Sequence, residues 1–232
     1  MTDSKRNGGT TFVLVHGAWA GSWSMMRVAD VLTAKGHRAF APTLSGLGER
    51  SHLAGADINL TTHINDVVNE VLWKDLKNIV LVGHSYSGIV ITGVAERIGE
   101  RIASIVYLDA FIPADGQSFA DFAEGWELVG ETIPAPPTSK GDYLDENDRA
   151  WVDAKATPHP TASLKEKLRV TGAYQRVPKK TYIQATGWDS PFGQTADALG
   201  KDPSWAVRQI ACGHDVGIDK PQELADLLIE AA

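Results

Sequence analysis

The alternation of short apolar runs with helical patterns constrains the fold of this chain most strongly. Residues 10–17 form a continuous run of apolar and β-branched residues that ends in a glycine, which is typical of a strand buried on both faces of a sheet. We expect strands in six segments: residues 10–17, 37–44, 78–85, 102–111, 179–187 and 204–213. Helical spacing occurs in four segments: residues 24–36, 61–76, 87–99 and 219–232. This order predicts an α/β fold with a mostly parallel central sheet and helices on both of its faces.

Residues 112–178 interrupt this alternation. They contain seven of the eleven prolines: Pro113, Pro134, Pro136, Pro137, Pro158, Pro160 and Pro178. Their helical pieces are short and weakly patterned, and the α/β pattern resumes after them. We therefore predict one domain over residues 1–232, with residues 112–178 inserted as a helical cap. In the last helix we expect Asp219 as the N-cap, with Pro221 and Glu223 in the first turn.

Composition and charge narrow the class of protein. A chain of 232 residues with 43% hydrophobic residues can bury a substantial core. The formal net charge of −7 argues against a nucleic-acid partner, which would favour a basic face. No apolar run approaches the ~18 residues that a membrane span needs. The single cysteine, Cys212, and a polar N-terminus without a signal-peptide pattern predict a cytoplasmic protein. The sequence leaves the oligomeric state open.

The hexapeptide GHSYSG at residues 83–88 nearly matches the nucleophile pattern G-x-S-x-G, with Ser87 in place of the second glycine. Ser85 falls where an apolar strand meets a helix, so its side chain is expected at the carboxyl edge of the sheet, where ligands bind. The tight turn requires small neighbours, and Gly83 and Ser87 satisfy this requirement. The alternative is a glycine-rich turn that serves only helix–strand packing.

A serine nucleophile needs a histidine base. His214 follows the last predicted strand and precedes the last helix, which places it at the same sheet edge as Ser85. His84 adjoins Ser85, and its side chain should diverge from that of its neighbour, whereas His16 is expected to be structural and His63 opens a helix. Three histidines lie in polar, loop-like sequence and are expected to face solvent: His37, His52 and His159.

Two aspartates are candidates for the acid that orients the base. Asp109 ends the strand that follows the nucleophile helix and lies in an apolar run, where a buried carboxylate is costly unless it is paired. Asp189 lies among Gly, Ser and Pro residues, where water can solvate it without a partner. We favour Asp109 and retain Asp189 as the alternative. Asp215 adjoins His214 and is poorly placed to reach the far nitrogen of that imidazole.

Together, FVLVHGAW at residues 12–19, GHSYSG, the cap-like insertion and CGHD at residues 212–215 resemble the α/β-hydrolase superfamily over nearly the whole chain. The HGAWAGSWSM run at residues 16–25 is similar to the openings of small plant methylesterases, hydroxynitrile lyases and their bacterial relatives. The resemblance implies an oxyanion hole at the backbone N–H groups of Ala18 and Tyr86. It also implies that some relatives carry their acid at the Asp109 position and others at the Asp189 position.

The remaining sequence patterns indicate candidate pocket residues but no cofactor or metal site. Trp19, Trp126 and Trp188 are candidates for an apolar substrate pocket under the cap, although a single tryptophan is more often part of a core. SGLGERS at residues 45–51 lacks the spacing of a dinucleotide-binding loop, and no His, Asp or Cys cluster has metal-ligand spacing. We therefore expect no cofactor and no metal.

These residues predict a serine carboxylic-ester hydrolase that acts on small or apolar esters through a Ser-His-Asp triad and an acyl-enzyme. One alternative is a hydroxynitrile lyase-type C–C lyase. In that subgroup a lysine follows the histidine, whereas here Asp215 would oppose a developing cyanide anion. Another is a hydrolase-fold receptor that binds a ligand without turnover. Dehalogenase and epoxide-hydrolase chemistry are disfavoured because those relatives use a carboxylate nucleophile.

Overall fold

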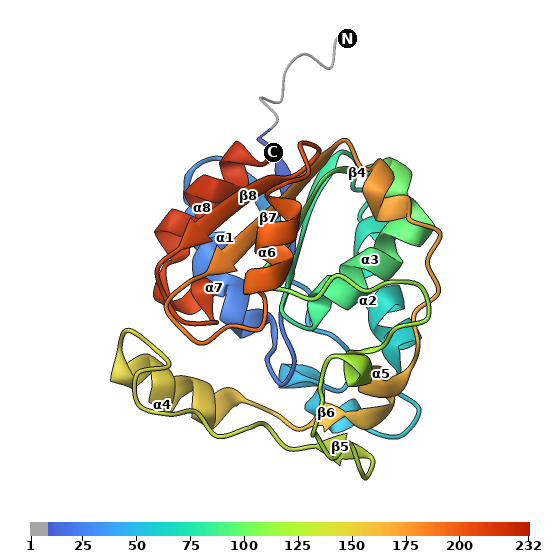
Figure 1. The fold of residues 1–232 in the computed structure, drawn as a ribbon, viewed down its shortest axis with the longest axis vertical. Helices are drawn as coiled ribbons and strands as arrows, with labels where there is room; N and C mark the ends of the chain where they lie inside the picture. The colour runs from blue at the N-terminus through green and yellow to red at the C-terminus, as the bar shows by residue number, and fades with distance from the viewer. Residues whose placement is uncertain (1–8) are drawn as a thin grey trace.

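The computed structural model describes residues 9–232, and Figure 1 shows their arrangement. The centre is a six-stranded sheet in the order β2-β1-β3-β4-β7-β8, in which all neighbouring strands are parallel. The strands are β1 (Thr11–Val15), β2 (Arg38–Phe40), β3 (Ile79–His84), β4 (Ile102–Leu108), β7 (Lys179–Ala185) and β8 (Ala206–Ile210). Each lies within a segment that the sequence predicts as a strand, so the expected α/β fold with a parallel sheet is confirmed.

The two faces of the sheet explain why its central strands, such as β3, are apolar along most of their length. In β3, Ile79 and Leu81 pack into one hydrophobic cluster, whereas Val80 and Val82 pack into another on the opposite face. Successive side chains of a strand point to opposite faces, so a strand covered on both sides has no position for a polar residue. All six residues of β3 are buried.

Helices cover both faces, as predicted. The pair α1 and α8 packs over one face, and α2, α3 and α6 pack over the other (Figure 1). The α-helices outside the insertion are α1 (Met26–Ala34), α2 (Leu60–Trp73), α3 (Ser87–Ile98), α6 (Gly193–Leu199), α7 (Val216–Asp219) and α8 (Pro221–Glu230). Short 3-10 helices are η1 (Ser22–Met25), η2 (Gly48–Leu53), η3 (Gly99–Arg101), η4 (Phe119–Asp121) and η5 (Ala173–Arg176).

The start of α8 differs from the expectation. Pro221 and Glu223 do lie in the first turn, but Lys220 is the N-cap residue and no side chain caps the helix. Asp219 as the N-cap was wrong, because its carboxylate accepts hydrogen bonds from the Leu144 N–H at 3.0 Å and the Gly213 N–H at 3.3 Å. Asp219, at the end of α7, therefore ties the insertion to the loop between β8 and α7.

Residues 112–178 lie between β4 and β7, at the end of the sheet where the strands terminate (Figure 1). Their regular elements are β5 (Thr132–Ile133), α4 (Glu146–Lys155), β6 (His159–Pro160) and α5 (Thr161–Lys165). The two strands form a short antiparallel ribbon, which the sequence did not predict. Strands of two residues have too few positions for any periodicity to be visible.

Candidate active site

Ser85 lies on a sharp turn between β3 and α3, as the sequence predicts. Its φ of 55° is in the left-handed region, and its N–H donates to the Leu108 carbonyl at 3.1 Å. The turn is too tight for larger neighbours. A Cβ at Gly83 would lie 2.5 Å from the Ser87 carbonyl oxygen, and a Cβ at Gly88 would lie 2.1 Å from the carbonyl oxygen of Phe111. Both glycines are therefore required by close backbone approach.

Ser87 has a specific contact in place of the usual glycine. The side chain is fully buried, and its hydroxyl donates a hydrogen bond to the His16 carbonyl. His16 directly follows β1 and begins the loop that contains Ala18, so this bond joins the Ser85 turn to that loop. The small size of residue 87 was expected, but the hydrogen bond could not be derived from the sequence.

His214 and Asp109 meet at the carboxyl edge of the sheet. His214 Nδ1 lies 2.7 Å from Asp109 Oδ2, and the carboxylate has no exposed surface. Two further donors satisfy it: the Ala185 N–H at 3.1 Å from Oδ1 and the Trp188 Nε1–H at 2.9 Å from Oδ2. A buried carboxylate held by three donors is stabilised in its charged form. The alternative, Asp189, is exposed to solvent.

Tyr86 directly follows Ser85 at the start of α3, and Ala18 lies in the loop after β1, where the preceding Gly17 packs against Ser85. Neither backbone N–H donates to another group within residues 9–232. Tyr86 is the N-cap residue of α3, so its N–H belongs to the unpaired donors that begin a helix. Free, fixed N–H groups of this kind can bind a negatively charged oxygen.

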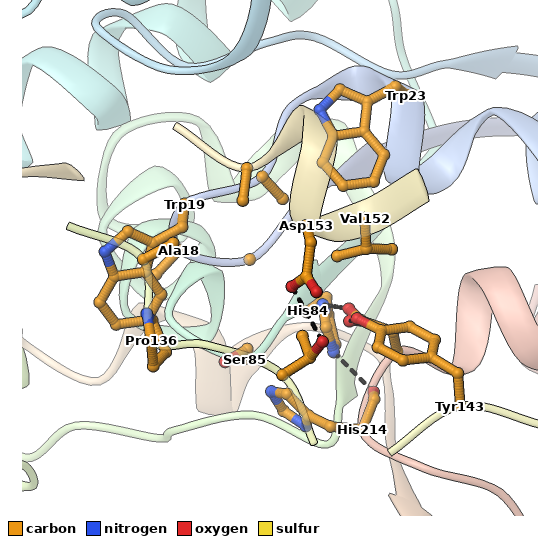
Figure 2. A pocket seen from close by; sticks show the side chains of 16 residues that line it. Ala18, Trp19, Trp23, His84, Ser85, Pro136, Tyr143, Val152, Asp153 and His214 are labelled. Carbon is orange, nitrogen blue, oxygen red and sulfur yellow. Dashed lines mark hydrogen bonds and ion pairs between the residues drawn. The ribbon is translucent and has the colours of Figure 1, made fainter. Parts of the chain in front are cut away.

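A cavity of about 170 Å³ opens beside Ser85 and His214, as Figure 2 shows. It is lined by the β1 loop, by the ends of the strands and by the insertion. The lining residues that bear on its chemistry are Trp19, Trp23, Pro136, Tyr143, Val152 and Asp153. Its walls are mainly apolar, and part of its roof comes from residues 135–156 of the insertion. An apolar cavity with a few polar groups at one end suits a small organic molecule.

The three tryptophans predicted for the pocket have different positions. Trp19 lines the cavity. Trp126 stacks on it, with ring centroids 5.4 Å apart, and Trp188 hydrogen-bonds to Asp109. Neither Trp126 nor Trp188 is among the residues that line the cavity. Trp188 is therefore a neighbour of the His214–Asp109 pair, and Trp126 supports Trp19 from outside.

A cluster of three polar side chains, His84, Tyr143 and Asp215, also borders the cavity, and the sequence did not predict it. His84 Nε2 lies 2.9 Å from the His214 carbonyl, and His84 Nδ1 lies 4.0 Å from Asp215 Oδ1. The Tyr143 hydroxyl of the insertion donates to Asp215 Oδ2. Burial lowers the pKa of His84 to about 4, so the ring is neutral at pH 7. Burial and the neighbouring Asp215 raise the pKa of Tyr143. These residues come together from three separate segments (Figure 2).

The expected exposure of the loop histidines is partly wrong. His52 is exposed, but His37 is half-buried and His159 has no exposed surface. His159 lies in β6, where its ring packs against Trp19, His63 and Tyr86, and no pattern in the sequence predicts the β5–β6 ribbon. His16 has the expected structural contacts, because its Nδ1 lies 2.8 Å from the Gly17 carbonyl and its Nε2 accepts from the Leu44 N–H at 3.1 Å.

The described part of the chain offers no site for a metal, because residues 9–232 contain no group of three His, Cys, Asp or Glu residues with suitable placement. In the same residues, none of the helices is both long enough and apolar enough to span a bilayer.

Comparison with known proteins identifies the class. The sequence profile of the alpha/beta hydrolase family matches residues 12–227, and the chain belongs to this family. Carbendazim hydrolyzing esterase of Nocardioides sp. (strain SG-4G) is 40% identical, over 94% of this chain and 97% of its own. Methylesterase 1 of Arabidopsis thaliana is 33% identical over 49% of this chain and 43% of its own.

A solved structure agrees with these relatives. An extracellular alpha/beta-hydrolase from a Paenibacillus species superposes with a TM-score of 0.81 and 28% identity, covering 96% of this chain and 99% of its own. That protein is described as sharing structural and functional homology with tobacco Salicylic Acid Binding Protein 2. The protein is thus an enzyme, an ester hydrolase of the alpha/beta hydrolase family, as the sequence predicts.

Proposed function

We propose that the protein hydrolyses small, mainly apolar carboxylic esters through a Ser85–His214–Asp109 triad and a covalent acyl-enzyme. The observation that carries this proposal is the 2.7 Å contact between His214 Nδ1 and the buried Asp109 carboxylate. His214 and Ser85 line the same cavity. With Nδ1 bonded to Asp109, Nε2 is left as the nitrogen that can accept a proton from Ser85.

In the acylation step, Ser85 Oγ attacks the ester carbonyl carbon while its proton passes to His214 Nε2. The tetrahedral intermediate collapses, the bond to the alcohol oxygen breaks, and His214 returns the proton to the leaving oxygen. Water then attacks the acyl-enzyme, again through His214, and releases the acid with a free Ser85 hydroxyl. The buried Asp109 carboxylate stabilises the imidazolium that forms in both steps.

We propose that the backbone N–H groups of Ala18 and Tyr86 form the oxyanion hole. Their N–H groups have no acceptor within residues 9–232, and they flank the residue that would carry the tetrahedral centre. Donors that are fixed before the reaction stabilise the developing oxyanion without a reorganisation cost. Removing one such donor typically lowers kcat by a factor of about 10²–10³.

The lining of the cavity indicates which class of ester should be tested first. Its apolar walls, including Trp19, Trp23 and Val152, favour an apolar or aromatic group on the ester. Carbendazim is a reasonable first compound to test, because the Nocardioides relative that hydrolyses it is 40% identical over nearly the whole chain. Parallel assays with p-nitrophenyl acetate and p-nitrophenyl decanoate would reveal a preference for short or long acyl groups, and carbendazim would show whether an aromatic carbamate is accepted.

The reaction is tested by pre-steady-state kinetics. The proposal predicts that p-nitrophenyl acetate gives a burst of p-nitrophenolate, followed by slower turnover as water hydrolyses the acyl-enzyme. Ser85→Ala should abolish both phases. Retention of most activity in Ser85→Ala protein that is folded by circular dichroism would overturn the proposal.

The alternatives receive less support. A hydroxynitrile lyase must stabilise a cyanide leaving group, yet the carboxylate of Asp215 lines the cavity directly after His214. A negative charge there opposes a second developing anion. A ligand-binding receptor would not need a buried acid paired with His214. Cyanide release from mandelonitrile above the rate in buffer would support the lyase hypothesis. Ligand-induced thermal stabilisation without turnover would support the receptor hypothesis.

We also propose that the protein works in the cytoplasm. The support is the single, buried Cys212, which cannot form a disulfide within the chain and suits a reducing compartment. Fractionation of the native cells, followed by detection with an antibody, tests this location against secretion.

A further inference from the structure

The insertion makes an unusually complete set of contacts with Trp19, which directly follows the proposed oxyanion donor Ala18. The Trp19 N–H donates to His159 Nδ1 at 3.2 Å, and the Trp19 carbonyl accepts from the Thr157 N–H at 2.9 Å. The indole Nε1–H donates to the Ile133 carbonyl at 3.0 Å. Every polar group of Trp19 is therefore bonded to the insertion. Its φ of 59° is a strained conformation for a residue with a side chain, and such conformations persist only where surrounding contacts hold them.

The contacts of His159 assign its tautomer. Nδ1 accepts from the Trp19 N–H, so the ring proton is on Nε2, which lies 2.8 Å from Ser163 Oγ. Ser163 Oγ in turn donates to the Pro160 carbonyl at 2.8 Å. The ring has no exposed surface, and burial holds the pKa of His159 well below its usual value. A neutral ring is what this bond requires, because an imidazolium has no lone pair for the Trp19 N–H.

The same imidazole also lies against the second proposed donor residue. The rings of His159 and Tyr86 pack edge to face, with centroids 4.9 Å apart. The Tyr86 hydroxyl lies 2.9 Å from His63 Nδ1, and His63 Nε2 lies 2.9 Å from the Ser45 carbonyl. Because that carbonyl can only accept, His63 carries its proton on Nε2 and its Nδ1 accepts from Tyr86. One buried side chain of the insertion thus contacts the residue that follows Ala18 and the ring of Tyr86.

We propose that His159 is a positioning residue of the oxyanion hole: by accepting the Trp19 N–H, it fixes the peptide unit that directly follows Ala18 and, through the Ala18 backbone, limits rotation of the Gly17–Ala18 peptide that carries the Ala18 N–H. This inference rests on the function proposed above. His159 does not line the cavity, so it acts through the loop and not through the substrate. The insertion therefore has a second role, which is to hold part of the catalytic machinery in addition to covering the substrate.

A matched pair of variants separates positioning from folding. Asn places its Oδ1 near the Nδ1 position of histidine, so H159N keeps an acceptor for Trp19 and loses the bond to Ser163. Gln places its amide near the Nε2 position, so H159Q keeps the bond to Ser163 and loses the acceptor. We expect H159N to retain kcat within about threefold, whereas H159Q loses about tenfold or more in kcat with KM changed by less than about threefold.

A transition-state readout accompanies the kinetics. An aryl trifluoromethyl ketone adds to Ser85 as a tetrahedral oxyanion, so its inhibition constant should weaken in H159Q by about the same factor as kcat/KM and stay nearly unchanged in H159N. The corresponding methyl ketone, which forms little adduct, should bind both variants alike. Should H159Q not fold, H159F, which keeps the ring contacts without Nδ1, takes its place with the same expectation.

The outcomes are distinct. Equal kcat losses in the two variants that follow their loss of thermal stability would overturn the inference, because a merely structural His159 predicts that result. Full activity in folded H159Q would also overturn it. Ser85→Ala is measured in the same assay: if it stays active, the proposed esterase mechanism fails and this inference fails with it. If Ser85→Ala is inactive and H159Q is unaffected, only the positioning role is lost.

Discussion

The Trp188 indole and the His214 imidazole donate to the same oxygen of Asp109, at 2.9 Å and 2.7 Å. The carboxylate is buried and lies at the end of β4, next to the strand that leads to Ser85. An acid that is bonded on both oxygens cannot rotate freely, so the orientation of His214 is fixed by three elements at once: β4, the segment after β7 and the segment after β8.

Asp109→Asn should abolish most activity, because an amide would favour the wrong tautomer of His214 and would not stabilise the imidazolium. In other serine hydrolases this change lowers kcat by a factor of about 10⁴. Asp189→Asn is the matched control, since Asp189 is exposed, and it should leave kcat within about twofold. Rates on p-nitrophenyl acetate, with melting temperatures for both variants, test this. A large loss in the Asp189 variant alone would assign the acid to that residue.

Trp188→Phe should lower kcat by a smaller factor. It keeps an aromatic ring beside His214, which now lies 4.7 Å from the indole between ring centroids, and removes one donor to Asp109. A hydrogen bond to a charged group contributes about 1.5–3 kcal/mol, so a loss of about tenfold to 100-fold is expected if its effect falls on the transition state. Trp126→Phe, which changes a ring outside the cavity, should have little effect. Equal losses in the two variants would mean that the bond to Asp109 is not responsible.

Ser87→Gly should remain active and lose stability. The change removes the hydroxyl that donates to the His16 carbonyl, at a cost of about 1 kcal/mol, and adds backbone freedom at the start of α3. Each 1 kcal/mol lowers the melting temperature by about 2–4 °C for a chain of this size. Ser87→Leu should abolish activity, because the position is fully buried against the loop after β1. An active Leu variant would show that this turn tolerates bulk and that its geometry matters less than we infer.

Stability should fall as the pH is lowered below about 6.5. Burial lowers the pKa of His16, His63 and His84 to about 4, whereas each unfolded histidine titrates near 6.5. Between those values the unfolded chain binds more protons, so each such group removes up to about 1.4 kcal/mol per pH unit as the pH falls, and nothing further below about 4. Urea unfolding from pH 7.5 to 4.5 measures this slope.

His63→Gln isolates one of these groups. The slope between pH 6 and 5 should decrease by the equivalent of about one proton, because the variant has no buried imidazole to charge at that position. His52→Gln replaces an exposed histidine and serves as the control, with an unchanged slope expected. An unchanged slope in His63→Gln as well would mean that His63 does not stay neutral in the folded protein over this range.

The sequence predicts the parts of this molecule that depend on local pattern. Apolar runs predict all six strands of the sheet, most clearly the central strands β1, β3 and β4, because a strand covered on both faces is mainly apolar. Ser85, Asp109 and His214 each lie at the end of a predicted strand or directly after one. Because parallel strands end at the same edge of a sheet, the sequence predicts that all three residues lie at that edge. The two edge strands differ most from the expectation, because β2 and β8 are each five residues shorter than the segments predicted for them.

The contacts made by the insertion could not be predicted. His159 and Trp19 are 140 residues apart in the chain, and Tyr143 and Asp215 are 72 apart. No periodicity in residues 112–178 indicates which side chains turn inward, so a histidine in polar sequence was expected at the surface. The same limit applies to Trp126 and Trp188, because their residue type suits a pocket but only the folded loops decide which tryptophan reaches it.

Covalent labelling determines whether Ser85 is the nucleophile. Diethyl p-nitrophenyl phosphate should phosphorylate the wild-type enzyme once, with loss of activity in proportion to labelling and with the label on the peptide that contains Ser85 by tandem mass spectrometry. Ser85→Ala should take up no label, whereas Ser87→Gly should be labelled like the wild type. Stoichiometric labelling at another residue, or inactivation of folded Ser85→Ala enzyme by the same reagent, would contradict the account.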